Sequence, residues 1–196
     1  RGTVANNNYD ITYIASTLTI TQAQQSALSV TTANIVYRTP ITLQAAGGSE
    51  GDLSFNVATT GTASCSIEDD TLFASGNAGS TCTVTATRAM TNNFVQKTSS
   101  PFTITVVPRP ITLTATAKEK FYGDLDPGFT YVVTAGSLFG SDTFTGSQTR
   151  EDGGNVGTYT INKGSLANSN YTVTYVPALL TINQRPITVT ATNKTK

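Results

Sequence analysis

The chain repeats part of its own sequence at both ends, and this self-similarity constrains the fold more than any single residue does. Residues 1–22 align without a gap to residues 163–184, with 11 identities at 22 positions. Residues 185–196 align in the same way to residues 109–120, with 9 identities at 12 positions. One repeat, 109–184, is therefore complete, and two further copies are partial. The matches predict a tandem array of small modules, an organisation typical of stalks, fibres and adhesive surfaces.

Alternation of apolar and threonine residues predicts strands. In Ile111–Ala115 and Tyr171–Tyr175 every second residue is apolar and threonines lie between them. A period of two is the period of a half-buried strand. Residues 23–108 lie outside the repeat and show about seven short strand patterns separated by turn residues, as a β-sandwich does. We therefore predict an all-β (mainly β) chain.

Two places in the complete repeat interrupt this pattern. Gly136–Gly146 is either a helical turn or an irregular crossover that carries three apolar side chains into the core, namely Leu138, Phe139 and Phe144. Pro177 has no N–H to donate to a ladder, so we expect it at an edge or a bulge.

Composition excludes several classes of function. Charged residues make up 12% of the chain and balance at 12 against 12, so the basic field that binds nucleic acid is missing. The chain has no histidine, which is the commonest general base and zinc ligand. No carboxylate pair has a supporting motif for glycoside hydrolysis. We therefore expect no enzyme, no catalytic residue, no metal site and no cofactor. No apolar run approaches the ~20 residues that span a bilayer, and the first residues do not resemble a signal peptide.

The chain has two cysteines, Cys65 and Cys82, which are too few for a structural zinc site. The alternatives are two free thiols in the core or one disulfide. An even count in a threonine-rich, loop-rich chain favours an oxidising, extracellular setting. We predict a Cys65–Cys82 disulfide between adjacent strands, in a protein that is secreted or held at the cell surface.

Three groups of charged residues have a functional reading and a structural alternative. Glu68–Asp70 carries hard oxygen ligands for calcium, but a hairpin turn also explains it. Asp124 and Asp126 have the same two readings, the alternative being a turn or an Asx-type cap. The lysines Lys118, Lys120 and Lys194 also have two readings. They either form a Lys–Asn isopeptide crosslink or lie at a solvated strand edge.

Threonine rows and tyrosines give two further candidates for recognition. The row Thr112–Thr116 is a candidate ladder for ice or carbohydrate, although ordinary solvent-facing threonine on a sheet explains it as well. Six tyrosines are candidates for stacking on sugars. Most of them fall on the apolar phase of strands, which favours core or rim positions. They are Tyr13, Tyr122, Tyr131, Tyr159, Tyr171 and Tyr175.

Short motifs mark the complete repeat: the opening Arg109–Thr112, the turn Phe121–Asp124 that leads to Pro127, the Gly157–Tyr159 strand and the closing Asn170–Tyr171. Together they resemble the MBG-type domain of bacterial surface proteins. The resemblance implies a β-grasp-like fold in which the first and last strands pair in parallel. It also implies occurrence in tandem within large adhesins.

Residues 23–108 resemble the Ig-like repeats that accompany such domains. The resemblance rests on Thr39–Leu43, Gly47–Ser49, Ala63–Cys65 and Gly79–Ala86. One residue departs from it: Arg38 stands where the glycine of a tight turn is expected.

The predicted fold is an Ig-like β-sandwich followed by a β-grasp-like MBG domain, flanked by two partial MBG repeats and arranged as beads on a string. Residues 1–22 are assigned to the C-terminal strands of a truncated MBG repeat and residues 23–108 to the Ig-like β-sandwich. Residues 109–184 are the complete MBG repeat, and residues 185–196 are the first strand of a following one. Prolines in Val107–Pro110 mark and stiffen the central boundary.

The predicted function is a structural tandem-repeat segment of a secreted bacterial surface adhesin or extracellular fibre, acting as stalk or filament body. The alternative is a glycan- or protein-binding module of the adhesin. The expected partners are neighbouring repeats of the same protein, with strand pairing of Tyr9–Ile20 and Ile187–Thr192 between copies in a fibre. A host or cell-surface glycan or protein is a further candidate, whereas nucleic acid and a membrane-spanning role are not expected.

Overall fold

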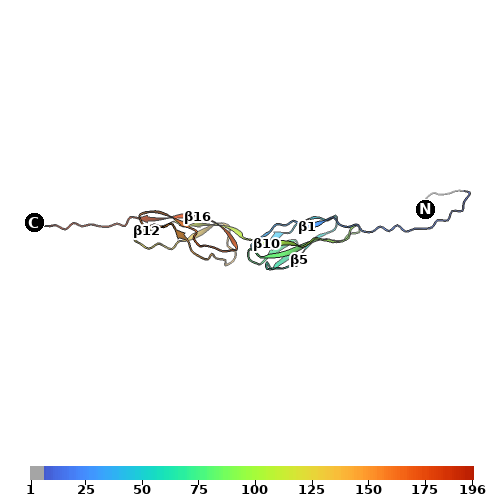
Figure 1. Cartoon of the computed structure of the whole chain (residues 1–196), viewed down its shortest axis with the longest axis horizontal. Helices are drawn as coiled ribbons and strands as arrows, with labels where there is room; N and C mark the ends of the chain where they lie inside the picture. Colours follow the sequence, from blue (N-terminus) through green and yellow to red (C-terminus); the bar gives the residue numbers. More distant parts are fainter. Residues whose placement is uncertain (1–6) are drawn as a thin grey trace.

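The computed structural model describes residues 7–196, and every regular element in this range is a β-strand. The described part of the chain therefore contains no helix that is long and apolar enough to cross a membrane. The strands gather into two β bodies that lie in line, with the terminal segments running outward at the two ends (Figure 1). We call residues 23–107 the N-terminal body and residues 109–183 the C-terminal body.

The strands of the N-terminal body are β1 Leu28–Val30, β2 Ile35–Val36, β3 Ile41–Thr42, β4 Ala45–Gly47, β5 Leu53–Thr59, β6 Cys65–Glu68, β7 Thr71–Ala74, β8 Thr81–Arg88, β9 Lys97–Thr98 and β10 Phe102–Val107. Those of the C-terminal body are β11 Arg109–Ala115, β12 Lys118–Phe121, β13 Tyr131–Ala135, β14 Thr149–Arg150, β15 Gly157–Asn162, β16 Tyr171–Val176 and β17 Ala178–Asn183.

Alternating burial explains why these sequences form strands. Along β8 the side chains of Cys82, Val84 and Ala86 are buried, while the threonines between them are half-buried. Side chains of successive strand residues point to opposite faces, so one face of β8 supplies the core.

Three small sheets make up the N-terminal body. The largest has the order β2-β10-β8-β5, with β9 paired to β8, and the others are β3-β7-β6 and β1-β4. Their buried side chains, among them Leu72, Val84 and Ile104, belong to one apolar cluster. The sheets are therefore held together by side-chain packing, because the strand ladders do not connect them.

The C-terminal body has two sheets, β13-β11-β16 and β12-β17-β15-β14. Its first strand passes from one sheet to the other between β11 and β12, and its last strand does so at Pro177, between β16 and β17. Pro177 thus lies at a switch between sheets, where its missing N–H costs no ladder bond. β11 pairs in parallel with β16, and β12 pairs in parallel with β17. This confirms the predicted parallel pairing of the first and last strands.

Gly136–Gly146 forms no helix, and the crossover reading is the one that the structure bears out. Leu138 and Phe144 pack against the apolar cluster, as predicted. Phe139 was expected in the core, but 46% of its surface is exposed. The physical reason is that its side chain lies against Arg38 of the other body.

Residues 7–22 and 184–196 belong to no strand. Residues 1–6 of the predicted truncated repeat lie outside the described residues. Apolar side chains of the two terminal segments face solvent, including Ile14 at 92%, Leu18 at 86% and Ile187 at 81% exposure. The assignment of both segments to partial repeats stays a prediction.

Candidate functional site

Cys65 and Cys82 form a disulfide with a sulfur–sulfur distance of 2.06 Å. Both residues are buried. Cys65 belongs to β6 and Cys82 to β8, which lie in different sheets. The predicted pairing is therefore confirmed, and the predicted placement on adjacent strands is wrong. Because β6 folds back on β7, the bond joins the β3-β7-β6 sheet to the β2-β10-β8-β5 sheet.

The junction between the two bodies is short. β10 ends at Val107 and β11 begins at Arg109, so Pro108 alone separates the two strands. The Tyr37 N–H donates to the Val107 carbonyl at 2.9 Å, and the Arg109 N–H donates to the Asn170 carbonyl at 2.9 Å. Backbone bonds thus hold the chain on both sides of Pro108, and no free linker separates the bodies.

Side chains from both bodies meet across this junction. The Tyr37 and Tyr171 rings pack edge to face with centroids 5.8 Å apart, and 3% and 5% of their surfaces are exposed. Both rings belong to the apolar cluster that runs from the N-terminal body to Ile111 and Leu113 in β11. One continuous core therefore crosses the boundary.

Polar contacts flank the two rings. The Arg109 guanidinium donates from Nη2 to Thr39 Oγ1 at 2.8 Å. Asn170 directly precedes β16. Its Oδ1 accepts a hydrogen bond from the Ala78 N–H at 2.9 Å, and its amide donates to Asn77 Oδ1 at 3.3 Å. Arg109, Asn170 and Tyr171 are all residues of the repeat motifs. At this boundary their side chains dock the repeat onto its neighbour.

The Tyr171 hydroxyl is fixed by two partners. It donates to Asp142 Oδ2 at 2.7 Å and accepts from the Phe139 N–H at 2.8 Å. Burial of the ring raises the pKa of Tyr171 above its ordinary value, and the nearby Asp142 carboxylate acts in the same direction. The crossover that contains Phe139 and Asp142 is thereby anchored at the junction.

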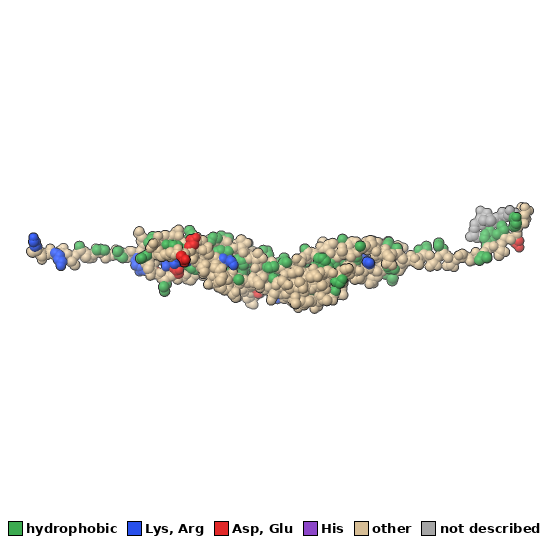
Figure 2. All heavy atoms as spheres, viewed as in Figure 1, with side chains coloured by type: hydrophobic (Ala, Val, Ile, Leu, Met, Phe, Trp, Pro, Cys, Tyr) green, Lys and Arg blue, Asp and Glu red, His purple; other side chains and the backbone are tan. Residues whose placement is uncertain are grey.

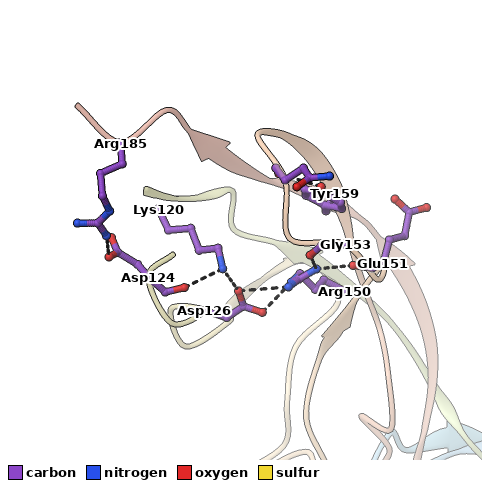
Figure 3. A network of polar contacts seen from close by, with 9 residues as sticks. Lys120, Asp124, Asp126, Arg150, Glu151, Gly153, Tyr159 and Arg185 are labelled. Carbon is purple, nitrogen blue, oxygen red and sulfur yellow. Dashed lines mark hydrogen bonds and ion pairs between the residues drawn. The ribbon is translucent and has the colours of Figure 1, made fainter. Parts of the chain in front are cut away.

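The opposite end of the C-terminal body carries a polar cluster (Figure 3). Lys120 Nζ and Arg150 Nε each donate to a different Asp126 oxygen at 2.7 Å. Hydrogen bonds from Arg150, and then from Lys120, lower the pKa of Asp126 below its ordinary value. Arg150 also donates to the Gly153 carbonyl at 2.7 Å and lies over the Tyr159 ring, 5.3 Å from its centroid. The cluster ties the turn after β12 to the segment that joins β14 and β15.

Arg185 closes the same end of the body. Its guanidinium pairs with Asp124 and donates from Nε to the Tyr122 carbonyl at 2.8 Å. Arg185 is the counterpart of Arg109 in the self-alignment. Arg109 follows the last strand of the N-terminal body and bonds Thr39 of that body. Arg185 follows the last strand of the C-terminal body and binds the turn of that body at Tyr122 and Asp124, so the same kind of contact recurs.

The structure distinguishes the two readings of the charged groups. Asp69 and Asp70 form the turn between β6 and β7, with Asp69 at a φ of 53°. The hairpin reading of that acidic run is therefore confirmed. Asp124 lies in a turn closed by its own N–H and the Phe121 carbonyl at 3.1 Å. Asp126 lies outside this turn, and among the described residues its carboxylate accepts from the Lys120 and Arg150 side chains and from no backbone N–H, so the turn and cap readings are wrong for it.

The lysines do not meet in a crosslinking site. Lys120 was expected at a solvated edge, but only 11% of its side chain is exposed. It bonds the Asp124 carbonyl and Asp126, and neither partner is an asparagine. A carboxylate that two cations keep ionised is a poor acyl donor for amide formation, which argues against a bond from Lys120 to Asp126. Lys194 lies in the exposed terminal segment.

Most of the candidate threonines and tyrosines are ordinary core or rim residues of the C-terminal body. Thr114 and Thr134 bond across β11 and β13 at 2.8 Å between their hydroxyls, and Thr114 is half-buried. The core or rim reading holds for Tyr131, Tyr159, Tyr171 and Tyr175. It is wrong for Tyr122, which is 51% exposed, and for Tyr13, which is 41% exposed.

Within residues 7–196, no three His, Cys, Asp or Glu side chains lie together as a group that could hold a metal ion. The face shown in Figure 2 is mostly uncharged, with small scattered apolar areas on both bodies. Tyr37 and the docking role of Asn170 did not follow from the sequence patterns. The prolines of Val107–Pro110 marked the position of the junction, and the recurrence of Arg109 as Arg185 was the available signal for its contacts.

Comparison with known proteins assigns part of the chain. Residues 111–181 match the family profile described as MBG domain (YGX type). No curated protein matches the chain. Among solved structures, Drosophila N-cadherin EC1-4 is similar at 10% identity with a TM-score of 0.32. The match covers 81% of this chain and 51% of the cadherin chain, so the present chain spans about half the length of that structure.

Proposed function

We propose, starting from the MBG domain of the YGX type in residues 111–181, that this chain is a non-enzymatic structural segment of a secreted bacterial surface adhesin or extracellular fibre. MBG domains are typical of bacterial surface repeat proteins, and the Cys65–Cys82 disulfide is consistent with an extracellular location. In this proposal residues 23–108 are an Ig-like sandwich and residues 109–184 a β-grasp-like repeat. The two act as consecutive beads of a stalk or filament body.

The continuous core across the junction is the observation that carries the proposal. A flexible array needs a linker and an interface that readily separates, whereas this junction has one residue between strands. The Tyr37 and Tyr171 rings are 3% and 5% exposed, so their contact is part of the buried core. A shared core fixes the orientation of the second body on the first, which is what a spacer requires.

Strand pairing between copies is the second part of the proposal, and the exposed terminal segments support it. Ile187 is 81% exposed while its counterpart Ile111 is 3% exposed, and Ile20 is 88% exposed while its counterpart Ile182 is 1% exposed. Applying the β11–β16 register to the terminal segments places Ile11 opposite Ile187 and Tyr13 opposite Val189. Parallel pairing of these segments from neighbouring modules would cover the apolar side chains.

The stalk proposal is tested by whether the two bodies tumble together. Residual dipolar couplings of the backbone amides are expected to fit one alignment tensor for both bodies. Replacing Tyr37 and Tyr171 by alanine removes the packed pair, so we expect the two bodies to need separate tensors. A short Gly-Ser insertion after Pro108 is expected to have the same effect.

The matched control is Tyr9→Ala. Tyr9 is the repeat counterpart of Tyr171 but is 72% exposed, so this change is expected to leave the couplings unchanged. Separate tensors in the unmodified chain would overturn the proposal.

A further inference from the structure

Arg38 has a backbone conformation that its residue type disfavours. It lies directly after Tyr37, at the turn that follows β2, with a φ of 55°. The Ig-like resemblance leads us to expect a glycine at this position, and glycine adopts positive φ without a steric penalty. Ser64, with a φ of 49°, is a second non-glycine residue in the left-handed region, and it borders the same cavity as Arg38. Strained residues that cluster around a cavity point to a function of their side chains.

The Arg38 guanidinium is held by rings and by no acceptor. Its carbon lies 5.3 Å from the Tyr37 ring centroid and 5.6 Å from the Phe139 ring centroid. Among the described residues it forms no ion pair, and its buried Nε has no hydrogen-bond partner. Stacking on aromatic faces orients the planar group while leaving its N–H donors free.

A cavity of about 480 Å³ opens beside Arg38 at the boundary between the two bodies. This volume falls in the range of ~300–1,000 Å³ that small-molecule sites occupy. Its wall combines apolar and hydroxyl groups, and none of the described residues that line it is acidic. The residues that matter for recognition are Arg38, Ser64, Ser66, Phe73, Ser75 and Phe139.

We propose that this cavity binds a sugar that carries a carboxylate, of the uronic acid or sialic acid type. Arg38 would pair with the carboxylate through its fork of N–H donors. The exposed Phe73 and Phe139 rings offer apolar faces to the C–H groups of a pyranose, and the serine hydroxyls match its hydroxyl groups. Arg109, which bonds Thr39 on the cavity wall, adds a second positive charge nearby.

Three serine hydroxyls beside the partly exposed Phe73 and Phe139 rings match the hydroxyl and C–H groups of a saccharide, so the proposal commits to a sugar, and a peptide carboxylate is an outcome of the test. The site adds recognition to the stalk role and does not depend on it. Loss of binding and loss of junction rigidity are measured separately.

The test uses the 196-residue chain with amide and arginine side-chain resonances followed by NMR. The probes are methyl glucuronide, a methyl sialoside, neutral methyl glucoside and an N-acetylated peptide with a free carboxylate. We expect saturable chemical-shift changes at Arg38, Ser75 and Phe139 with at least one acidic sugar. Comparison of the glucuronide with the sialoside shows which of the two acid types the cavity binds. We expect binding of the glucoside to be about tenfold weaker, a difference of about 1.4 kcal/mol. Equal binding of the neutral sugar, tighter binding of the peptide or no saturable shift in the millimolar range would each overturn the proposal.

Three variants separate recognition from structure. Arg38→Lys keeps the charge but loses the planar fork, so affinity is expected to fall about tenfold. The matched control is Arg88→Lys, a partly buried arginine of the same body that bonds the Gly51 carbonyl, which is expected to bind normally. Arg38→Gly relieves the positive φ, so we expect lost binding with an unchanged or higher melting temperature. Unchanged affinity in either Arg38 variant would assign this residue to the junction alone and overturn the proposal.

Discussion

Asn170 illustrates how one residue acts in two modules. Its carbonyl accepts the Arg109 N–H inside the repeat, while its side chain bonds Ala78 and Asn77 of the preceding body. The same residue therefore sets the start of β11 and the docking of the neighbour. Changes at such a residue affect the fold and the junction together, whereas the ion pairs of Asp126 lie within the C-terminal body alone.

Removal of the disulfide is expected to destabilise the N-terminal body. Cys65 and Cys82 are 17 residues apart. Closing a loop of this length lowers the conformational entropy of the unfolded chain and so stabilises the folded state by about 3 kcal/mol. We expect the Cys65→Ala/Cys82→Ala variant to lose about this much free energy of unfolding in urea denaturation. A reductant should lower the midpoint of the native chain but not that of the variant. Equal midpoints of the native chain with and without reductant would contradict the prediction.

Asp126 is expected to make stability depend on acid pH. Its folded-state pKa lies below the unfolded value of about 3.9. The stabilisation is therefore complete above the unfolded pKa and is lost as the pH falls through the folded pKa. We expect the melting temperature to drop below about pH 4 in the native chain, and less so in Asp126→Asn. The control is Asp70→Asn, at a turn whose carboxylate has no ion pair among the described residues, and it should follow the native chain.

At the scale of strands, the repeated sequence shows that burial and not local sequence determines the state of a segment. The C-terminal body ends with β17, and the corresponding residues near the N-terminus form no strand although half of the aligned positions are identical. β17 pairs with β12 and β15, which the earlier segment lacks around it. A strand needs its ladder partners and its apolar contacts at the same time.

The matched pair Leu180 and Leu18 tests this point. Leu180 is fully buried and Leu18 is 86% exposed, and both precede a Thr-Ile pair. We expect Leu180→Ala to lower the free energy of unfolding by about 2–5 kcal/mol through lost burial and a cavity. Leu18→Ala is expected to change it by less than about 0.5 kcal/mol, as surface substitutions do. Thermal and urea unfolding of both variants measures the difference, and equal losses would contradict it.

Much of the strand pattern could be predicted from the sequence because alternation records burial directly. The alternating segments Ile111–Ala115 and Tyr171–Tyr175 lie within β11 and β16. The short strands β2, β9, β12 and β14 were not predicted, since two to four residues carry too little alternation and their pairing depends on distant partners such as Val106 for Ile35. The disulfide could be predicted from the cysteine count. The contact of Tyr37 with Tyr171 could not, because two separate bodies must dock to create it.

At the scale of the whole molecule, the two bodies present their junction contacts at their ends, so modules can be added in line (Figure 1). The N-terminal body contributes Tyr37 and Thr39, and the C-terminal body contributes Tyr171 and Arg109. At its far end, Arg185 already binds the turn of the complete repeat.

Completing the second repeat is expected to fold the C-terminal segment. Appending residues 121–184 after Lys196 supplies the equivalents of the strands that β11 and β12 pair with. We expect Ile187 and Val189 to become buried, as Ile111 and Leu113 are, and the amide protons of residues 187–192 to exchange more slowly. The control is the same extension with Val189→Asp, which places a charge in the new core. Fast exchange in the unmodified extension would contradict the assignment of residues 185–196 as a first strand.

The parallel pairing of β11 with β16 and of β12 with β17 has a mechanical consequence. The chain enters the C-terminal body through β11 and leaves it through β17, so a pull on the two ends slides β11 past β16 and β12 past β17, each pair lengthwise. All hydrogen bonds between them then bear load together. By contrast, the antiparallel pair β15 and β17 would open bond by bond if pulled apart from Gly157 and Ile182. We expect single-molecule extension along the chain axis to require a larger unfolding force than extension through that pair. In the proposed fibre, tension along the chain would therefore load both parallel pairs in their resistant direction.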